Sequence, residues 1–413
     1  MAISVSIPLD VIYEIIRKLG EVEDYNTLAN MSLTCKAVVP FSRARLFYSV
    51  QFLPGASNGV EVELSRLRKL DALFTSNPML PTYVREFEFG NIQSKLLWFA
   101  GEPLARVLNS LTQLKIFLIT GPYPNMDWNE FDEEVKIACI RASARPTLEN
   151  LEVSGTMNLP TAFITEAVQI TWLYLVDAQM IVGDPAPFAR SEPQPRRDLK
   201  TLTYQSCDGT PRLLLQQISQ PGCRFDLSTL QRFEIVSGSA DELMVAWSIA
   251  GLAKGSLRKL VIPSPEIDPC NPLPLDVIRE IGTFSELRNL HIAVELADFY
   301  QLLKNVTFPK LENAGIGIYL RPEEYQDETH EPPLAIDTRL VMEIDDRLLT
   351  IMPCLRTIQL YFCTDFRRTP GPDDDIEGLV GRFRQQLLKL FPTLHESEVV
   401  VECSLSNDAC VNF

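Results

Sequence analysis

"LRKLVI", residues 257–262, is the stretch that decides how most of this chain folds. Apolar side chains occupy its first, fourth and sixth positions, and their alternation is the period of a β-strand with one buried face. The same L-x-x-L-x-L pattern, with substitutions, begins at Val84, Leu114, Leu148, Ile170, Leu199, Leu230, Leu257, Leu287, Leu311 and Leu355. The starting positions lie 22 to 34 residues apart, except for the last interval of 44. We therefore predict ten strands that belong to one repeating unit.

The segments between these strands have the spacing of amphipathic helices. Helical periodicity is found in residues 65–78, 131–143, 240–255 and 296–306. Alternating strands and helices predict an α/β fold with a parallel sheet. Because strands pack about 4.8 Å apart and helices about 8–10 Å apart, the stack should curve, with the sheet concave and the helices convex.

The interval and the motif together are typical of a leucine-rich-repeat solenoid. Cys207 and Cys363 stand at the ninth position of their repeats, where that motif has Asn or Cys. A conventional α/β domain with leucine-rich strands is the alternative. The C-terminal stretch "ESEVVVECSLSNDACVNF" is expected to add a last strand.

The first fifty residues follow a different pattern. "IPLDVIYEIIRKL", residues 7–19, predicts a helix with Pro8 in its first turn and a broad apolar stripe, ending at Gly20. Asp24 can cap a second helix over residues 25–38, and a third is expected over residues 40–50. Three such short helices bury little surface by themselves, so we expect them to keep an apolar patch for a partner.

This N-terminal stretch resembles an F-box. The resemblance is carried by Ile7-Pro8, by Asp10 and the spaced aliphatic residues after it, by Asp24-Tyr25 and by Leu33-Thr34-Cys35-Lys36. "PFSRARLFYSVQF" is similar to the segment after the box in many fungal members, whereas Val38 stands where the family often has tryptophan. The resemblance implies docking onto the Skp adaptor, which hangs on a cullin scaffold. By position, the implied adaptor-binding residues are Pro8, Leu9, Val11, Ile12, Ile15 and Ile16, with Leu28 and Leu33 shared between the core and the interface.

The expected organisation has three parts. Residues 1–50 form the F-box, residues 51–80 a connecting segment with the first solenoid helix, and residues 81–413 the solenoid. An acidic insertion at residues 321–346 is either a solvated loop or a lid over the concave face. The acidic stretch that begins at Pro372 is expected to cap a helix.

Target-binding residues follow from the strand alternation. Side chains that flank the second leucine of each motif point away from the helices. The candidates are Trp172, Tyr174, Arg232, Glu234, Lys259, His291, Gln359 and Tyr361. Trp172 and Tyr174 are the best candidates for hot spots, because aromatic anchors contribute much of the binding energy at interfaces.

Composition excludes several other functions. The net charge of −16 argues against binding to nucleic acid or to a membrane surface. We expect neither a signal peptide nor a membrane span. The nine cysteines include no CxxC pair, the three histidines form no metal pattern, and no nucleotide-binding or hydrolase motif occurs. We expect reduced thiols, no cofactor and no enzymatic activity, in a soluble protein of the cytoplasm or nucleus.

The resulting hypothesis is a substrate-recruiting subunit of a Skp–cullin–F-box ubiquitin ligase, with a protein target bound on the solenoid. The alternative is a leucine-rich-repeat scaffold without a link to ubiquitin, in which the N-terminal helices only cap the array. Val38 keeps this alternative open.

Overall fold

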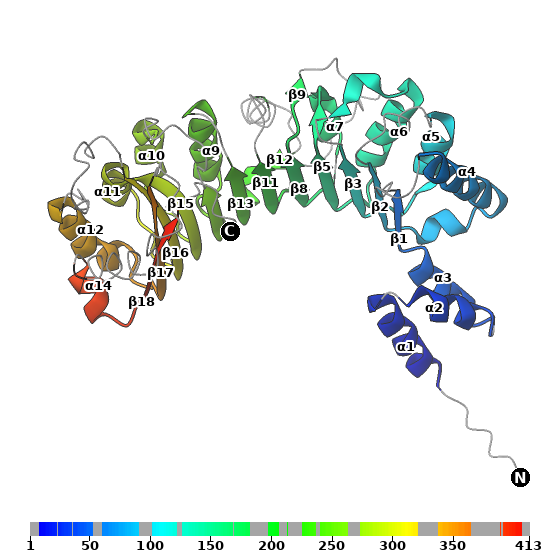
Figure 1. Ribbon diagram of the computed structural model, residues 1–413, viewed down its shortest axis with the longest axis horizontal. Coiled ribbons are helices and arrows are strands. Elements are labelled where there is room, and N and C mark those ends of the chain that lie inside the picture. The colour runs from blue at the N-terminus through cyan, green and yellow to red at the C-terminus, as the bar shows by residue number, and fades with distance from the viewer. Residues whose placement is uncertain are drawn as a thin grey trace, which may run out of the picture. The chain divides into compact units, whose positions relative to one another are not determined.

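The computed structural model (Figure 1) divides into unit 1, Met1–Arg197, and unit 2, Asp198–Phe413. It describes residues 8–22, 24–34, 36–52, 60–90, 101–121, 126–167, 169–181, 197–205, 213, 225–236, 240–262, 273–320, 338–364, 389 and 391–406. Each unit is an α/β structure built on a parallel sheet.

Unit 1 begins with three helices, which we call the helical trio. They are α1 (Leu9–Glu21), α2 (Tyr25–Ser32) and α3 (Val39–Leu46). Asp24 caps α2 as predicted, because its carboxylate accepts a hydrogen bond from the Thr27 backbone N–H at 3.0 Å. The first helix does not stop at Gly20 but runs on to Glu21.

The rest of unit 1 is a parallel sheet with the strand order β1-β2-β3-β5-β8. These strands are β1 (Ser49–Phe52), β2 (Glu86–Gly90), β3 (Ile116–Thr120), β5 (Asn150–Ser154) and β8 (Trp172–Val176). The connections contain α4 (Val60–Ser76), η1 (Leu80–Tyr83), α5 (Gly101–Ser110), η3 (Trp128–Glu130), α6 (Glu133–Ser143) and α7 (Thr161–Thr165). Two short parallel pairs join β4 (Met126–Asp127) to β6 (Thr156–Met157), and β7 (Leu159–Pro160) to β9 (Met180–Ile181).

Unit 2 has the strand order β11-β13-β14-β15-β16-β17-β18. The strands are β11 (Thr201–Gln205), β13 (Arg232–Val236), β14 (Lys259–Ile262), β15 (Asn289–Glu295), β16 (Asn313–Leu320), β17 (Thr357–Thr364) and β18 (Val400–Ser406). Between them lie β12 (Phe225–Asp226), η4 (Leu227–Thr229), α9 (Ala240–Leu252), α10 (Leu275–Ile281), α11 (Leu296–Asn305), α12 (Thr338–Ile351) and α14 (Pro392–Glu396). The boundary between the units falls inside β10 (Arg197–Asp198).

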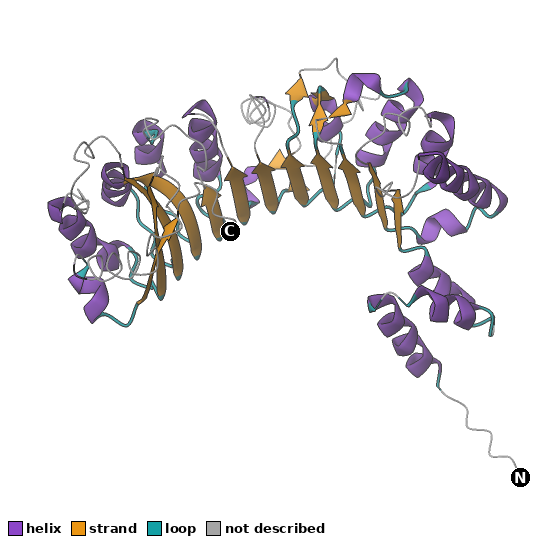
Figure 2. Ribbon diagram, in the orientation of Figure 1, coloured by secondary structure: helices purple, strands orange, loops and turns teal. Residues whose placement is uncertain are grey.

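All ten motifs form a strand that begins two residues after the start of the motif. The first position of every motif is buried. These residues are Val84, Leu114, Leu148, Ile170, Leu199, Leu230, Leu257, Leu287, Leu311 and Leu355. Inside the strands the burial alternates, most regularly in β15. In each unit the helices of the connections cover one face of the sheet (Figure 2), and we call the other face the open face. The predicted α/β fold with a parallel sheet is therefore confirmed.

A recurring backbone contact joins neighbouring motifs within each unit. The carbonyl of the residue after the leading leucine accepts two N–H groups from the following motif. Arg85 O accepts from Lys115 N at 2.7 Å and from Ile116 N at 2.9 Å, and Gln231 O accepts from Arg258 N and Lys259 N at 2.7 and 3.0 Å. The same arrangement is found at Lys115, Glu149, Lys200, Arg258, Arg288 and Glu312. These contacts hold the strands of neighbouring repeats in one register.

Aromatic rings fill much of the core in unit 1. Phe87 and Phe89 of β2, Phe117 of β3 and Phe163 of α7 form a chain of contacts with ring centroids 5.9 to 6.4 Å apart. In unit 2, Phe284 and Phe308 stack 5.8 Å apart at the turns that precede β15 and β16.

Several other expectations about the elements are wrong. The predicted second helix over residues 25–38 ends at Ser32. The predicted third helix ends at Leu46, and Ser49–Phe52 is the strand β1, whose Phe52 is buried against Phe87. Four residues are too few for a period to be read, so only the neighbouring strand reveals β1. Residues 338–346 belong to α12 and not to a loop, because Val341, Ile344 and Leu348 recur at helical spacing and are buried. Residues 321–337, Cys207 and the stretch from Pro372 lie outside the described residues.

Replacement of a leading leucine should destabilise its unit. We predict that Leu257→Ala lowers the free energy of unfolding by about 2–5 kcal/mol, because a fully buried side chain is lost and a cavity remains. Urea denaturation measures this loss. Arg258→Ala, at the exposed neighbouring position, is the matched control and should change stability by about 0.5 kcal/mol or less. Equal losses in the two variants would contradict this packing scheme.

Candidate protein-interaction surfaces

The helical trio has a small core. Ile16, Leu28 and Val38 are buried together, one from each helix or its N-cap position, with Ile12 and Leu19 packed beside them. Val38 therefore lies in the core of the trio. Ile16 is 2% exposed and is therefore not on the surface, contrary to its assignment as an adaptor contact. Leu28, predicted to be shared between the core and the interface, is fully buried in the core.

Other members of that predicted set lie on the surface of the trio. Leu9, Val11 and Ile15 on α1 are 47%, 45% and 43% exposed, and Leu33 after α2 is 84% exposed. Pro8 is exposed at the N-cap of α1. Val11 and Ile15 are four residues apart and therefore lie on one face of the helix, beside the half-buried Ile12. The trio thus leaves aliphatic side chains in solvent next to its core.

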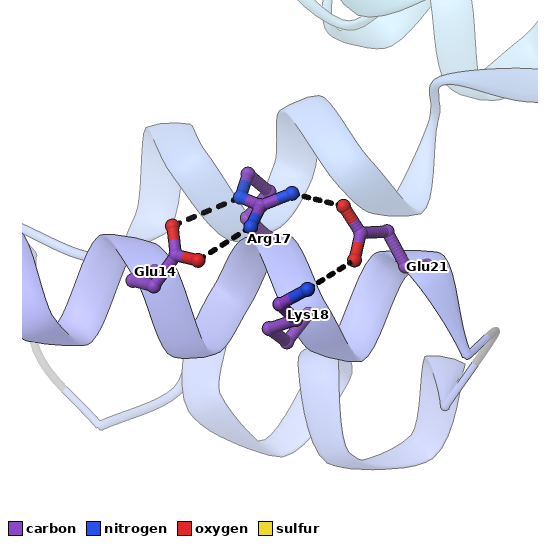
Figure 3. A network of polar contacts seen from close by, with 4 residues as sticks. All are labelled: Glu14, Arg17, Lys18 and Glu21. Carbon is purple, nitrogen blue, oxygen red and sulfur yellow. Dashed lines mark hydrogen bonds and ion pairs between the residues drawn. The ribbon is translucent and has the colours of Figure 1, made fainter.

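The polar face of α1 is held by an ion-pair network (Figure 3). Arg17 donates hydrogen bonds to Glu14 and Glu21, and Lys18 pairs with Glu21 at 3.1 Å. The bond from Arg17 lowers the pKa of Glu14 below its usual value. These charges lie at positions spaced by three and four residues, a spacing at which ion pairs support a helix.

The third side of α1 faces α3. Tyr13 stacks on Phe41 with ring centroids 3.7 Å apart. Beside this stack a groove of about 550 Å³ is lined by Tyr13, Arg17, Phe41, Arg45, Tyr48 and Tyr83, among others. The exposed Val11 and Ile15 do not line this groove, so they form a separate surface.

The open face of unit 1 combines aromatic, aliphatic and acidic side chains. Trp172 is 53% exposed at the start of β8, and Tyr174 is half-buried two residues later. Ile116 and Leu118 of β3 are also half-buried on this face. Glu88 of β2 and Glu152 of β5 lie on either side of Leu118 in the same row of the sheet. The predicted pair Trp172 and Tyr174 is therefore brought together with two carboxylates.

Those two carboxylates were not among the sequence candidates. A signal was present, since Glu88, Glu152 and Glu234 all occupy the fifth position of their motifs. Burial, as the largest cause, raises the pKa of Glu88 and of Glu152 above the usual value. The charge of Glu88 raises the pKa of Glu152 further. The ionised form of each carboxylate is therefore disfavoured in the folded protein.

The open face of unit 2 is polar. Arg232 is exposed and Lys259 is half-buried on neighbouring strands, and their ion pairs to Glu234 are 2.9 and 2.6 Å long. Although burial raises the pKa of Glu234, the two cations outweigh it, and the pKa lies below the usual value. Farther along, Tyr361 donates to Gln359 at 2.7 Å, and Gln359 donates to Glu402 at 2.7 Å.

His291 lies between these groups on β15. A Cβ atom on Gly315 would collide with its imidazole, so that glycine leaves the space that the ring fills. Burial, and then Lys259, lower the pKa of His291. All eight predicted target-binding residues therefore lie on the open faces of the two units, two in unit 1 and six in unit 2.

No cluster of three or more potential metal ligands occurs among the described residues. Cys139 is a buried free thiol and Cys354 an exposed one. In the described parts of the chain, no helix has the length and apolarity needed to cross a bilayer. Comparison of the sequence with protein-family models gives no match, and neither does comparison with curated protein sequences.

The raised pKa values predict that replacing one of these glutamates by the neutral glutamine stabilises the protein, and that the gain depends on pH. A carboxyl whose pKa is raised by folding destabilises the folded state when ionised, and the penalty disappears below the unfolded pKa of about 4.3. Glu152→Gln should therefore raise the melting temperature at pH 7, and the gain should shrink as the pH falls toward 4.

Thermal unfolding followed by circular dichroism at several pH values measures this difference. Glu149→Gln is the control, because Glu149 is exposed and pairs with Lys115 at 2.6 Å. It should not stabilise the protein. A lower melting temperature for Glu152→Gln at pH 7 would show that the carboxylate is favourably held.

Proposed function

We propose that this chain is the substrate-recruiting subunit of a Skp–cullin–F-box ubiquitin ligase, with the helical trio as the F-box and the two sheets as parts of a leucine-rich-repeat solenoid. The trio docks on the Skp adaptor, and the open face of the sheet binds a protein target. The chain performs no chemistry itself. Its contribution is to hold a target lysine near a charged conjugating enzyme, which raises the effective concentration.

The observation that carries this proposal is the exposure of Leu9, Val11, Ile15 and Leu33 beside a core of only a few side chains. Soluble proteins seldom leave grouped aliphatic residues in water unless a partner covers them. A mere cap of the array would instead turn this stripe onto the first strands. Ile12 and Ile16 pack inside the trio and Ile15 is exposed, which supports an adaptor-binding stripe over such a cap.

The regular stacking of motifs supports the second half of the proposal. Repeat arrays use an extended sheet surface to bind other proteins, and the side chains on such a surface can vary without cost to the core. On the open faces of this chain, half-buried and exposed side chains alternate with the buried residues of each strand. The eight predicted target-binding residues are of this kind.

Binding of the purified chain to the Skp adaptor tests the proposal. Wild type should bind, and Val11→Asp/Ile15→Asp should weaken binding at least about tenfold, because charges would enter an apolar interface at its anchors. Both side chains are exposed, so the fold should be unchanged. Isothermal titration calorimetry measures the affinity, and circular dichroism checks the helices.

Val62→Asp on α4 is the matched control, since Val62 is an equally exposed valine on a helix of the same unit. It should bind the adaptor like wild type. Leu28→Asp should unfold the trio and so abolish binding together with its helical signal. Absence of binding by wild type, or full binding by the Val11/Ile15 variant, would contradict the proposal. The alternative, a leucine-rich-repeat scaffold without a link to ubiquitin, would then be the better interpretation.

A further inference from the structure

The open face of unit 1 differs from that of unit 2 in how its glutamates are held. Glu88, Glu152 and Glu234 occupy the same position of their motifs. Glu234 has two cations of its own, Arg232 and Lys259. For Glu88, the described contact is a hydrogen bond of 3.4 Å from the hydroxyl of Thr120, and in the described part of the chain neither Glu88 nor Glu152 has an ion pair. Among the described residues, these two half-buried carboxylates therefore have no cation partner, whereas Glu234 has two.

The sheet register places these carboxylates around an apolar centre. Glu88, Leu118 and Glu152 are consecutive partners on β2, β3 and β5. Neighbouring strands are about 4.8 Å apart, so the two glutamates are separated by about 10 Å at the backbone. A cation lying on the Leu118 side chain is within reach of both. The planar guanidinium of arginine suits this position best, because it presents donors on two edges and an apolar face.

The same face continues into aromatic side chains. Tyr174 is the register partner of Glu152, and Trp172 is the partner of Asn150 in the row before it. With Ile116 and Leu118 they make an apolar surface around the acidic centre. Strands alternate their side chains, so a single extended segment laid on this face could place one cation and one apolar residue at once.

We propose that the open face of unit 1 binds an extended segment of a protein partner by an arginine that inserts between Glu88 and Glu152, with an apolar residue of that segment on Trp172 and Tyr174. The charge complementarity is specific to this face, since Arg232 and Lys259 occupy the corresponding face of unit 2. The raised pKa of both glutamates agrees with a site that gains from an added cation. The proposal rests on the proposed function only in taking this partner to be the recruited target.

The test is an array of random twelve-residue peptides whose central residue is fixed as Arg, Lys, Gln or Glu, probed with the full-length chain. The Arg set should bind best, the Lys set more weakly, and the Gln and Glu sets least. For soluble copies of the strongest peptides, fluorescence anisotropy should show that Glu88→Gln and Glu152→Gln each weaken binding about tenfold, as loss of one hydrogen bond to a charged group would. Trp172→Ala should also weaken it.

Glu149→Gln removes the same charge from a nearby exposed site and should leave peptide affinity unchanged. Because Glu152→Gln should also be more stable than wild type, weaker binding by that variant cannot come from unfolding. Equal binding to the four sets, no binding to any set, or unchanged affinity in both glutamine variants would overturn the proposal. Adaptor binding is measured separately, so its failure would overturn the ubiquitin-ligase function and leave the arginine site standing.

Discussion

The structure depends on one backbone contact that is repeated from motif to motif. In eight of the ten motifs, the carbonyl of the residue after the leading apolar residue accepts two N–H groups from the next motif, as Arg85 does from Lys115 and Ile116. This contact sets the register, and the register places every leading apolar residue under the helices and every flanking residue on the open face. Side-chain hydroxyls reinforce it, because Thr147 donates to Leu114 O at 2.7 Å and Ser256 donates to Leu230 O at 2.8 Å.

Within each motif, the buried positions determine stability and the flanking positions are available for recognition. The buried positions are aliphatic or aromatic in both units, whereas the flanking positions range from Trp172 to Glu234. The backbone hydrogen bonds between motifs do not involve the flanking side chains. The same arrangement of strands can therefore carry surfaces of different chemistry. Unit 1 carries an acidic and aromatic surface, and unit 2 carries a surface whose charges are largely paired with one another.

In the helical trio, by contrast, the apolar side chains are not all buried. Its core is small, and part of its apolar stripe remains in water at Val11 and Ile15. The ion pairs of Arg17 with Glu14 and Glu21 lie along the polar face of α1. They support the helix without covering its exposed aliphatic side chains. The proposed function and the proposed arginine site thus use two surfaces of different chemistry, an aliphatic one on the trio and an acidic one on the sheet of unit 1.

The amino-acid sequence by itself determined the ten strands and the outward direction of residues such as His291, because both follow from an alternation that is local to six residues. It also determined the cap at Asp24. Only the tertiary structure decided which part of the α1 stripe is exposed, since Ile16 is buried by residues of two other segments, Leu28 and Val38. The strand β1, and the absence of a described cation beside Glu88 and Glu152, were decided in the same way. Their partners come from neighbouring strands, and a pattern read along one strand does not contain them.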